Sequence, residues 1–184
     1  MMLRFLDFAF SLLGLILGAP VFLVIFVLGL FDTGSPIFRQ QRVGRYQKSF
    51  TLVKFRTMQS DTASVPSHFA DASAITPLGV FLRRTKLDEL PQLWNVMKGE
   101  MSLVGPRPCL LSQNELIRER DALAVFDSRP GITGLAQVSN IDMSTPKLLA
   151  ETDARMLQNL TLAMYFKYIF MTLGGKGTGD RIKN

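Results

Sequence analysis

The sequence predicts an α+β protein in which a membrane segment precedes a small, mostly helical domain with short strands. Three observations lead to this prediction. No charged residue occurs from Phe8 to Phe31. The segment from Phe50 to Phe55 alternates and is rich in branched and aromatic residues, as strands are. Several later segments carry residues typical of helix starts and helix ends.

The uncharged segment is long enough to cross a membrane. About 24 residues at a rise of ~1.5 Å give roughly 36 Å, compared with a hydrocarbon core of ~30 Å. Pro20 follows Ala19 near the middle and predicts a kink or a break, because proline removes a backbone hydrogen bond inside a helix. The residues alone therefore allow both a kinked spanning helix and a re-entrant hairpin. A signal peptide fits less well, since no small-residue cleavage site closes the segment.

The charge distribution indicates which side of the membrane carries the rest of the chain. Arg4 precedes the uncharged segment, and a basic group follows it closely: Arg39, Arg42, Arg45 and Lys48. By the positive-inside rule the following domain lies on the cytoplasmic side. The net charge of +6 suggests anionic lipid or phosphorylated substrates as partners. Nucleic acid is not an expected partner, since no nucleic-acid-binding motif is recognisable.

Length and cysteine content set further bounds. A chain of 184 residues forms about one domain, and its single cysteine, Cys109, excludes an internal disulfide. The polar segment from Gln59 to Ile75 predicts a mobile loop that could border a site. The segment from Leu160 to Leu173 is too short to span a membrane; it fits an interfacial helix with its Tyr side chains near headgroups, or equally a helix packed on the core.

The remaining elements follow from local signals. Pro91 is tolerated only in the first turn of a helix, so the helix that continues through Val96 is expected to start near Leu87 or Asp88. Gly174 and Gly175 should end the last helix. The other expected elements are a short strand at Met101–Val104 and helices at Pro77–Arg84, Asn114–Phe126 and Pro146–Gln158.

Asp88 and Glu89 are the main candidates for chemistry. In the first turn of a helix, carboxylates are stabilised as anions and phosphate oxygens are attracted too. An ionised Asp beside a bound phosphate is a potential nucleophile. Taken alone, the pair also fits an ordinary N-cap. Two arginines in rigid turns, Arg107 between prolines and Arg129 before Pro130, favour a phosphate site because a fixed guanidinium suits bidentate contacts.

These motifs resemble those of the monotopic phosphoglycosyl transferases, the bacterial sugar transferases that start glycoconjugate assembly. Three motifs in the same order carry most of the resemblance, and two earlier segments also fit. They are Leu87–Leu93, Val104–Pro108 and Arg129–Gln137, preceded by Pro36–Gly44 and Lys54–Met58.

The resemblance implies a topology. Residues 1–34 would form a re-entrant membrane hairpin that breaks at Ala19 and Pro20, residues 35–174 the catalytic domain and residues 175–184 a flexible tail. The domain would lie on the cytoplasmic face of the bacterial inner membrane, with interfacial amphipathic helices. The sequence predicts no oligomeric state.

The resemblance also implies a reaction. Asp88 would attack the β-phosphate of a UDP-sugar, expected to be an N-acetylated amino sugar, and expel UMP; polyprenyl phosphate would then take the phosphosugar. Asp88 would also bind Mg²⁺, and Glu89 would activate the lipid phosphate or hold the metal. Arg83, Arg107 and Arg129 are the expected phosphate ligands. Arg4 could contact the lipid phosphate, or simply flank the membrane segment.

Two other functions remain compatible with the residues. A metal-dependent phosphohydrolase using Asp88 would pass the phosphosugar to water. A membrane-tethered scaffold without chemistry would tolerate the loss of Asp88 and Arg107.

Overall fold

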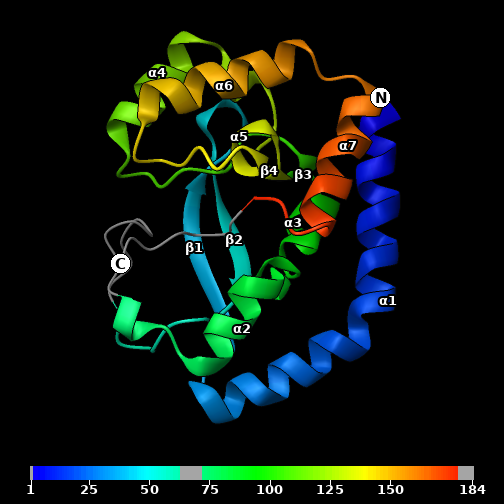
Figure 1. The fold of residues 1–184 in the computed structure, drawn as a ribbon, viewed down its shortest axis with the longest axis vertical. Coiled ribbons are helices and arrows are strands. Elements are labelled where there is room, and N and C mark those ends of the chain that lie inside the picture. Colours follow the sequence, from blue (N-terminus) through cyan, green and yellow to red (C-terminus); the bar gives the residue numbers. More distant parts are fainter. Residues whose placement is uncertain (1, 63–71, 178–184) are drawn as a thin grey trace.

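The computed structural model describes residues 2–62 and 72–177. A two-stranded hairpin lies at the centre, with α4 and α6 above it and α1 along one side and below (Figure 1). The helices and strands, in chain order, are α1 Met2–Asp32, β1 Ile37–Val43, β2 Ser49–Phe55, α2 Pro77–Thr85, α3 Gln92–Lys98, β3 Ser102–Val104, α4 Asn114–Ala122, β4 Gly131–Thr133, α5 Leu135–Val138, α6 Pro146–Gln158 and α7 Leu162–Leu173.

Helix α1 is the one helix in the described ranges that is long and apolar enough to cross a membrane. Pro20 lies inside it. Figure 1 shows α1 sharply bent into two halves, as expected where proline removes a backbone hydrogen bond. The first half runs beside α7, and Leu3 and Leu6 pack against the cluster around Tyr165. In the second half, Ile25 packs with core residues of β2 and α2.

The central hairpin pairs β1 and β2 in antiparallel register, from Ile37 opposite Phe55 to Val43 opposite Ser49. The strand expected at Phe50–Phe55 is confirmed as β2. Strand β1 was not expected from the sequence. On the buried side, Leu52 packs in one cluster with Val96 of α3 and with Met101, which follows α3.

The link from α2 to α3 differs from the expectation. Helix α2 begins at Pro77 as expected, but the single helix expected from Leu87 or Asp88 is wrong in its start. A 3-10 turn covers Leu87–Glu89, and α3 begins only at Gln92. The cause is Pro91, which has no N–H to donate to the carbonyl of Leu87. That carbonyl accepts the N–H of Leu90 instead, at 3.2 Å.

Strands β3 and β4 pair in parallel and bring two distant motifs together. The segment after Arg129, expected as a turn, in fact contains β4 and the short α5. The backbones cross so closely that a Cβ on Gly131 would lie 2.0 Å from the nitrogen of Gly105, so glycine is required there. This crossing fixes the turn that contains Arg107.

Helices α4, α6 and α7 form where they were expected, with two corrections that concern the end of α4 and the burial of α7. Helix α6 has the expected bounds, whereas α4 ends at Ala122 rather than Phe126, because Ala124 adopts a left-handed conformation. Helix α7 ends before Gly174 as expected. Its residues Tyr165 and Tyr168 are buried in the core, so the expectation that they lie near headgroups is wrong. The opposite face, with Phe170 and Leu173, is exposed.

Two expectations fall largely outside the described residues. The ends of the expected loop at Gln59–Ile75 are joined, since the N–H of Gln59 donates to the carbonyl of Ala74 at 2.9 Å. Residues 63–71 of this segment, and residues 178–184 of the expected tail, are outside the described part of the chain.

Candidate active site

Asp88 and Glu89 lie in the 3-10 turn between α2 and α3, which packs against α2 and β2. Both residues are buried, with 6% and 8% of their surface exposed. Burial of two neighbouring carboxylates is costly unless cations or hydrogen-bond donors compensate them. The surrounding residues should therefore be basic.

Arg107 is the clearest of these basic partners. Its Nη2 donates to Oε1 of Glu89 at 2.9 Å, forming a partly buried ion pair. Arg107 follows β3 and stands between Pro106 and Pro108, so its backbone has little freedom. The structure thus brings together the second and first of the three motifs.

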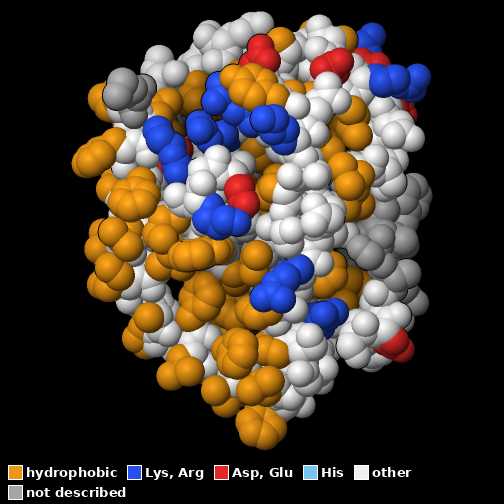
Figure 2. Space-filling view, turned by 180° about the vertical axis from the view of Figure 1, so that it is seen from behind, with side chains coloured by type: hydrophobic (Ala, Val, Ile, Leu, Met, Phe, Trp, Pro, Cys, Tyr) orange, Lys and Arg blue, Asp and Glu red, His pale blue; other side chains and the backbone are white. Residues whose placement is uncertain are grey.

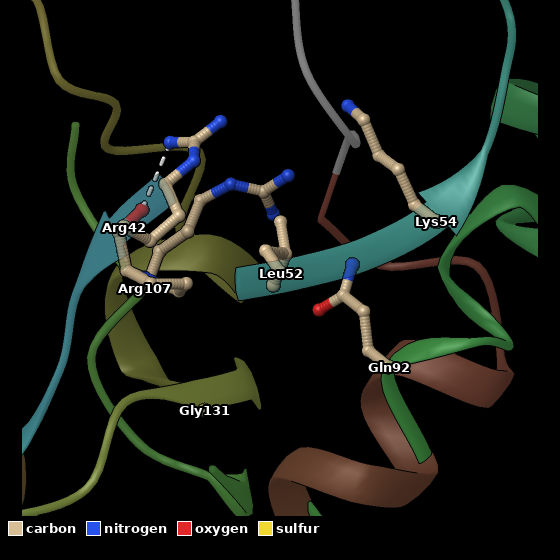
Figure 3. Close-up of a pocket in the computed structure, with 7 residues that line it drawn as sticks. Arg42, Leu52, Lys54, Gln92, Arg107 and Gly131 are labelled. Atoms are coloured by element: carbon tan, nitrogen blue, oxygen red, sulfur yellow. Dashed lines mark hydrogen bonds between the residues drawn. The ribbon is translucent and has the colours of Figure 1, made fainter. Parts of the chain in front are cut away.

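A small pocket opens beside Arg107, at the side of the central hairpin (Figure 3). Arg42 from β1 and Lys54 from β2 line it together with Gln92, the first residue of α3. Arg42 is held in place: Nη1 donates to the carbonyl of Pro108 at 3.0 Å and Nη2 to Oε1 of Gln40 at 2.6 Å. Three cationic side chains and an amide suit a group with several phosphate oxygens.

Lys86 adds a fourth cation next to the acidic pair. It adopts a left-handed conformation (φ 59°) as the cap of α2. Its Nζ donates to the carbonyl of Lys176 at 2.5 Å. Burial lowers the pKa of Lys86, the charge of Glu89 opposes this, and Arg107 lowers the pKa further. Lys86 therefore belongs to the same electrostatic cluster as Glu89 and Arg107.

Arg83 lies in the last turn of α2, which packs against the acidic turn. Its Nε donates to Oγ1 of Thr57 at 2.9 Å. Thr57 itself is fixed by a close approach, since a Cβ on Gly79 would lie 2.0 Å from its carbonyl oxygen. This hydrogen bond holds the side chain of Arg83 on Thr57.

Arg4 and Arg129 lie elsewhere, at the C-terminal end of α3. Arg4 donates to the carbonyls of Val96 and Met97 at 2.6 and 2.9 Å, and Nε of Arg129 donates to the carbonyl of Gly99 at 2.8 Å. Cations are favourable there because the last carbonyls of a helix are unpaired. Burial and the charges of Arg45 and Arg4 lower the pKa of Arg129. The structure therefore does not bring these two arginines to Glu89, which precedes the other end of α3.

The donor set for a metal is small. Within residues 2–62 and 72–177, no group of three His, Cys, Asp or Glu side chains could hold a metal ion. Mg²⁺ commonly takes one or two carboxylates and completes its shell with water and substrate phosphates. Asp88 and Glu89 fit such a substrate-assisted site, although one oxygen of Glu89 is already engaged by Arg107.

The positions of Arg42 and Lys54 beside the pocket, and of Lys86 beside Glu89, were not predicted from the sequence. Arg42 and Lys54 lie within two of the segments that carry the family resemblance. Successive side chains of a strand point to opposite faces of a hairpin, so every second residue shares a face. That signal could have placed them beside one pocket. Nothing local to Lys86 indicated that it caps α2 next to Glu89.

The structure thus has a buried acidic turn beside a basic pocket, on a domain packed against a long apolar helix that could be a membrane segment. Residues 1–176 match the family model described as bacterial sugar transferase. The chain belongs to this family.

Three relatives illustrate its range. The UDP-galactose-lipid carrier transferase of Erwinia amylovora is 34% identical, and the match covers 93% of this chain and 40% of the relative. The exopolysaccharide production protein ExoY of Rhizobium meliloti is 36% identical, covering 92% of this chain and 83% of the relative. The undecaprenyl-phosphate galactose phosphotransferase of Salmonella typhimurium is 35% identical, covering 92% and 39%. The chain thus spans about two fifths of the length of the first and third relatives.

Proposed function

We propose that the protein transfers a sugar phosphate from a UDP-sugar to polyprenyl phosphate at the cytoplasmic face of the bacterial inner membrane, releasing UMP. One observation carries the proposal: the buried Asp88–Glu89 turn adjoins a pocket lined by Arg42, Lys54 and Arg107. Two relatives add support, since one is a UDP-galactose-lipid carrier transferase and the other an undecaprenyl-phosphate galactose phosphotransferase.

The reaction would have two displacements at one phosphorus atom. A carboxylate oxygen of Asp88 attacks the β-phosphorus of the donor, and the bond to the bridging oxygen breaks, so UMP leaves with the electron pair. An oxygen of polyprenyl phosphate then attacks the same phosphorus, and the bond to Asp88 breaks. The products are a polyprenyl diphosphate sugar and a regenerated carboxylate.

The pocket residues would supply charge neutralisation, which is the main requirement of phosphoryl transfer. Arg42, Lys54 and Arg107 would bind the donor's diphosphate, with Arg83 close to the nucleophile. Mg²⁺ bound by Asp88 and the donor phosphates would neutralise further charge on the leaving group. Glu89, held by Arg107, would orient the incoming lipid phosphate or share the metal.

We also propose that α1 is re-entrant, with its two halves entering and leaving the same membrane face. The support is that both ends of α1 contact the same domain. Near its start, Arg4 binds the carbonyls that end α3. At its end, Oδ2 of Asp32 accepts the hydroxyl of Thr76 at 2.7 Å. A spanning helix would place its ends on opposite faces of the bilayer, so they could not both reach one domain.

The surface agrees with this placement. Figure 2 shows apolar side chains gathered over the lower part of one face, with basic side chains above them. Large exposed apolar residues include Leu17, Leu23 and Phe31 of α1 and Phe81 of α2. A polyprenyl chain leaves the bilayer only at a cost of about 0.8 kcal/mol per CH₂, so a membrane-bound position suits an acceptor of this kind.

The test uses the purified protein in nanodiscs with Mg²⁺, undecaprenyl phosphate and a panel of UDP-sugars that includes UDP-galactose and UDP-N-acetylated amino sugars. UMP and a lipid-linked sugar should form together with at least one donor, and not with Asp88→Asn, because Asn still caps a turn but is no nucleophile. Sugar phosphate released to water without lipid would indicate a phosphohydrolase. Full transfer by Asp88→Asn would contradict the assigned role of Asp88.

A further inference from the structure

A buried ion pair lies behind the turn that carries Arg107, outside the pocket. Arg120 of α4 and Asp153 of α6 are 1% and 0% exposed. Both Nε and Nη2 of Arg120 donate to Oδ2 of Asp153, at 3.1 and 2.7 Å. The pair joins α4 to α6, the two helices that lie above the central hairpin in Figure 1.

Stability alone is a poor explanation of this pair. Removing two charges from water costs several kcal/mol per ion, and apolar pairs of similar volume are often as stable or more so. Here the compensation is incomplete, because Oδ1 of Asp153 is buried without a hydrogen-bond partner among the described residues. Burial accordingly raises the pKa of Asp153, while the charge and hydrogen bonds of Arg120 oppose the rise.

The third contact of Arg120 leads to the active site. Its Nη1 donates to the backbone carbonyl of Arg107 at 2.8 Å. The next carbonyl, that of Pro108, is held by Arg42. Two guanidinium groups therefore bind consecutive carbonyls of a turn already restricted by its prolines. From this fixed backbone, the side chain of Arg107 reaches Glu89.

We propose that Arg120 and Asp153 form a positioning pair, which holds the backbone at Arg107 so that its guanidinium stays on Glu89 and in the pocket. Asp153 orients Arg120, and Arg120 orients Arg107; neither touches the substrate. The inference rests on the proposed function for the reaction that is measured. Misplacing a catalytic group by about 1 Å can reduce the rate roughly 100-fold.

The test replaces the pair with apolar residues of similar combined volume, Arg120→Met with Asp153→Val. The melting temperature should stay within about 3 °C of the wild type, because apolar replacement of a buried pair is near neutral. The turnover number should fall roughly 10- to 100-fold. Thr152→Val is the matched control, since Thr152 is buried on the same helix as Asp153 and its hydroxyl donates to the carbonyl of Leu148. It should keep wild-type turnover.

A cycle with Arg107→Ala separates positioning from general damage. In that background the apolar pair should reduce turnover less than about 2-fold, because the group that it positions is gone. An equal loss in both backgrounds, or a stable apolar variant with wild-type turnover, would overturn the proposal. Arg120→Lys offers a second variant if the double replacement fails to fold: it keeps a charge but cannot bind Asp153 and the carbonyl with a rigid fork, so turnover should still fall.

Hydrogen exchange of the peptide spanning residues 103–110 provides a readout without turnover. Exchange should accelerate in the apolar variant and not in Thr152→Val, and unchanged exchange would count against the pair. If the wild type itself transferred no sugar, the proposed function would fail, while the exchange result would still decide whether the pair fixes the turn.

Discussion

Replacing Asp7 with alanine should release the first half of α1 from the domain. Asp7 is almost fully buried in α1. Its Oδ1 accepts three hydrogen bonds: from Oγ of Ser102 at 3.0 Å, from the N–H of Leu103 at 2.9 Å and from the hydroxyl of Tyr165 at 2.9 Å. This one oxygen joins α1 to β3 and to α7.

The loss of folding stability follows from the hydrogen-bond donors that lose their acceptor. In Asp7→Ala, the partly buried N–H of Leu103 and the buried hydroxyl of Tyr165 lose their acceptor, at about 1–3 kcal/mol each, whereas the Ser102 hydroxyl can rotate. The total is roughly 2–6 kcal/mol, a range that includes the cost of removing one partner from a buried charged network. For a chain of this size, 1 kcal/mol shifts the melting temperature by about 2–4 °C, so a fall of roughly 10 °C is expected. Tyr165→Phe, which removes one donor, should cost about 1–2 kcal/mol.

The assay is thermal unfolding in nanodiscs, followed by the fluorescence of the single tryptophan, Trp94. Ser11→Ala is the matched control: Ser11 is fully buried one turn further along α1, and its hydroxyl has no hydrogen-bond partner within the described residues. It should melt within about 2 °C of the wild type, because no donor or acceptor loses a partner. If Asp7→Ala also melted within about 2 °C, the account of how α1 is attached would be wrong.

Three further predictions concern single side chains. Arg107→Ala should lower turnover roughly 100-fold. Arg107→Lys should recover only part of the turnover, because an ammonium cannot bind phosphate or Glu89 with a planar fork. Wild-type turnover in Arg107→Ala would contradict a role of Arg107 in the reaction. Burial raises the pKa of Cys109, so iodoacetamide at pH 8 should label it slowly in the folded protein and quickly in denaturant, as measured by intact mass. Burial and the charge of Asp7 raise the pKa of Tyr165 above its unfolded value of ~10. The stability that its hydroxyl contributes should therefore be complete below that pH and decline as the pH rises above it. Melting temperatures measured against pH should show this decline in the wild type and not in Tyr165→Phe.

The parts of the fold that were predicted correctly have local causes. Pro77 starts α2 and Gly174 follows the end of α7, because proline and glycine act through their own backbone geometry. Strand β1 was missed because its polar residues at positions 39–42 show no apolar alternation, and its pairing with β2 determines it instead. The start of α3 was misjudged because Pro91 was taken as a first-turn residue rather than as the cause of a 3-10 turn.

In the candidate site too, local sequence signals predicted some residues, whereas others are placed only by tertiary contacts. The motifs indicated the acidic pair and Arg107, but no local signal distinguishes an arginine that faces a pocket from one that binds carbonyls. Arg129 precedes a proline as Arg107 does, yet it binds the carbonyl of Gly99. The partners of Asp7 and Arg120 are far away in the sequence, at Tyr165 and Asp153, and only tertiary packing brings them together.

The most direct test of the central claim is the intact mass of the protein after mixing with Mg²⁺ and each UDP-sugar in the absence of polyprenyl phosphate. A covalent mechanism at Asp88 predicts a mass increase equal to one phosphosugar, removed when polyprenyl phosphate is added and absent in Asp88→Asn. If the protein formed lipid-linked product and UMP with no adduct under rapid quenching, or formed the adduct equally in Asp88→Asn, the claim that Asp88 is the nucleophile would be contradicted.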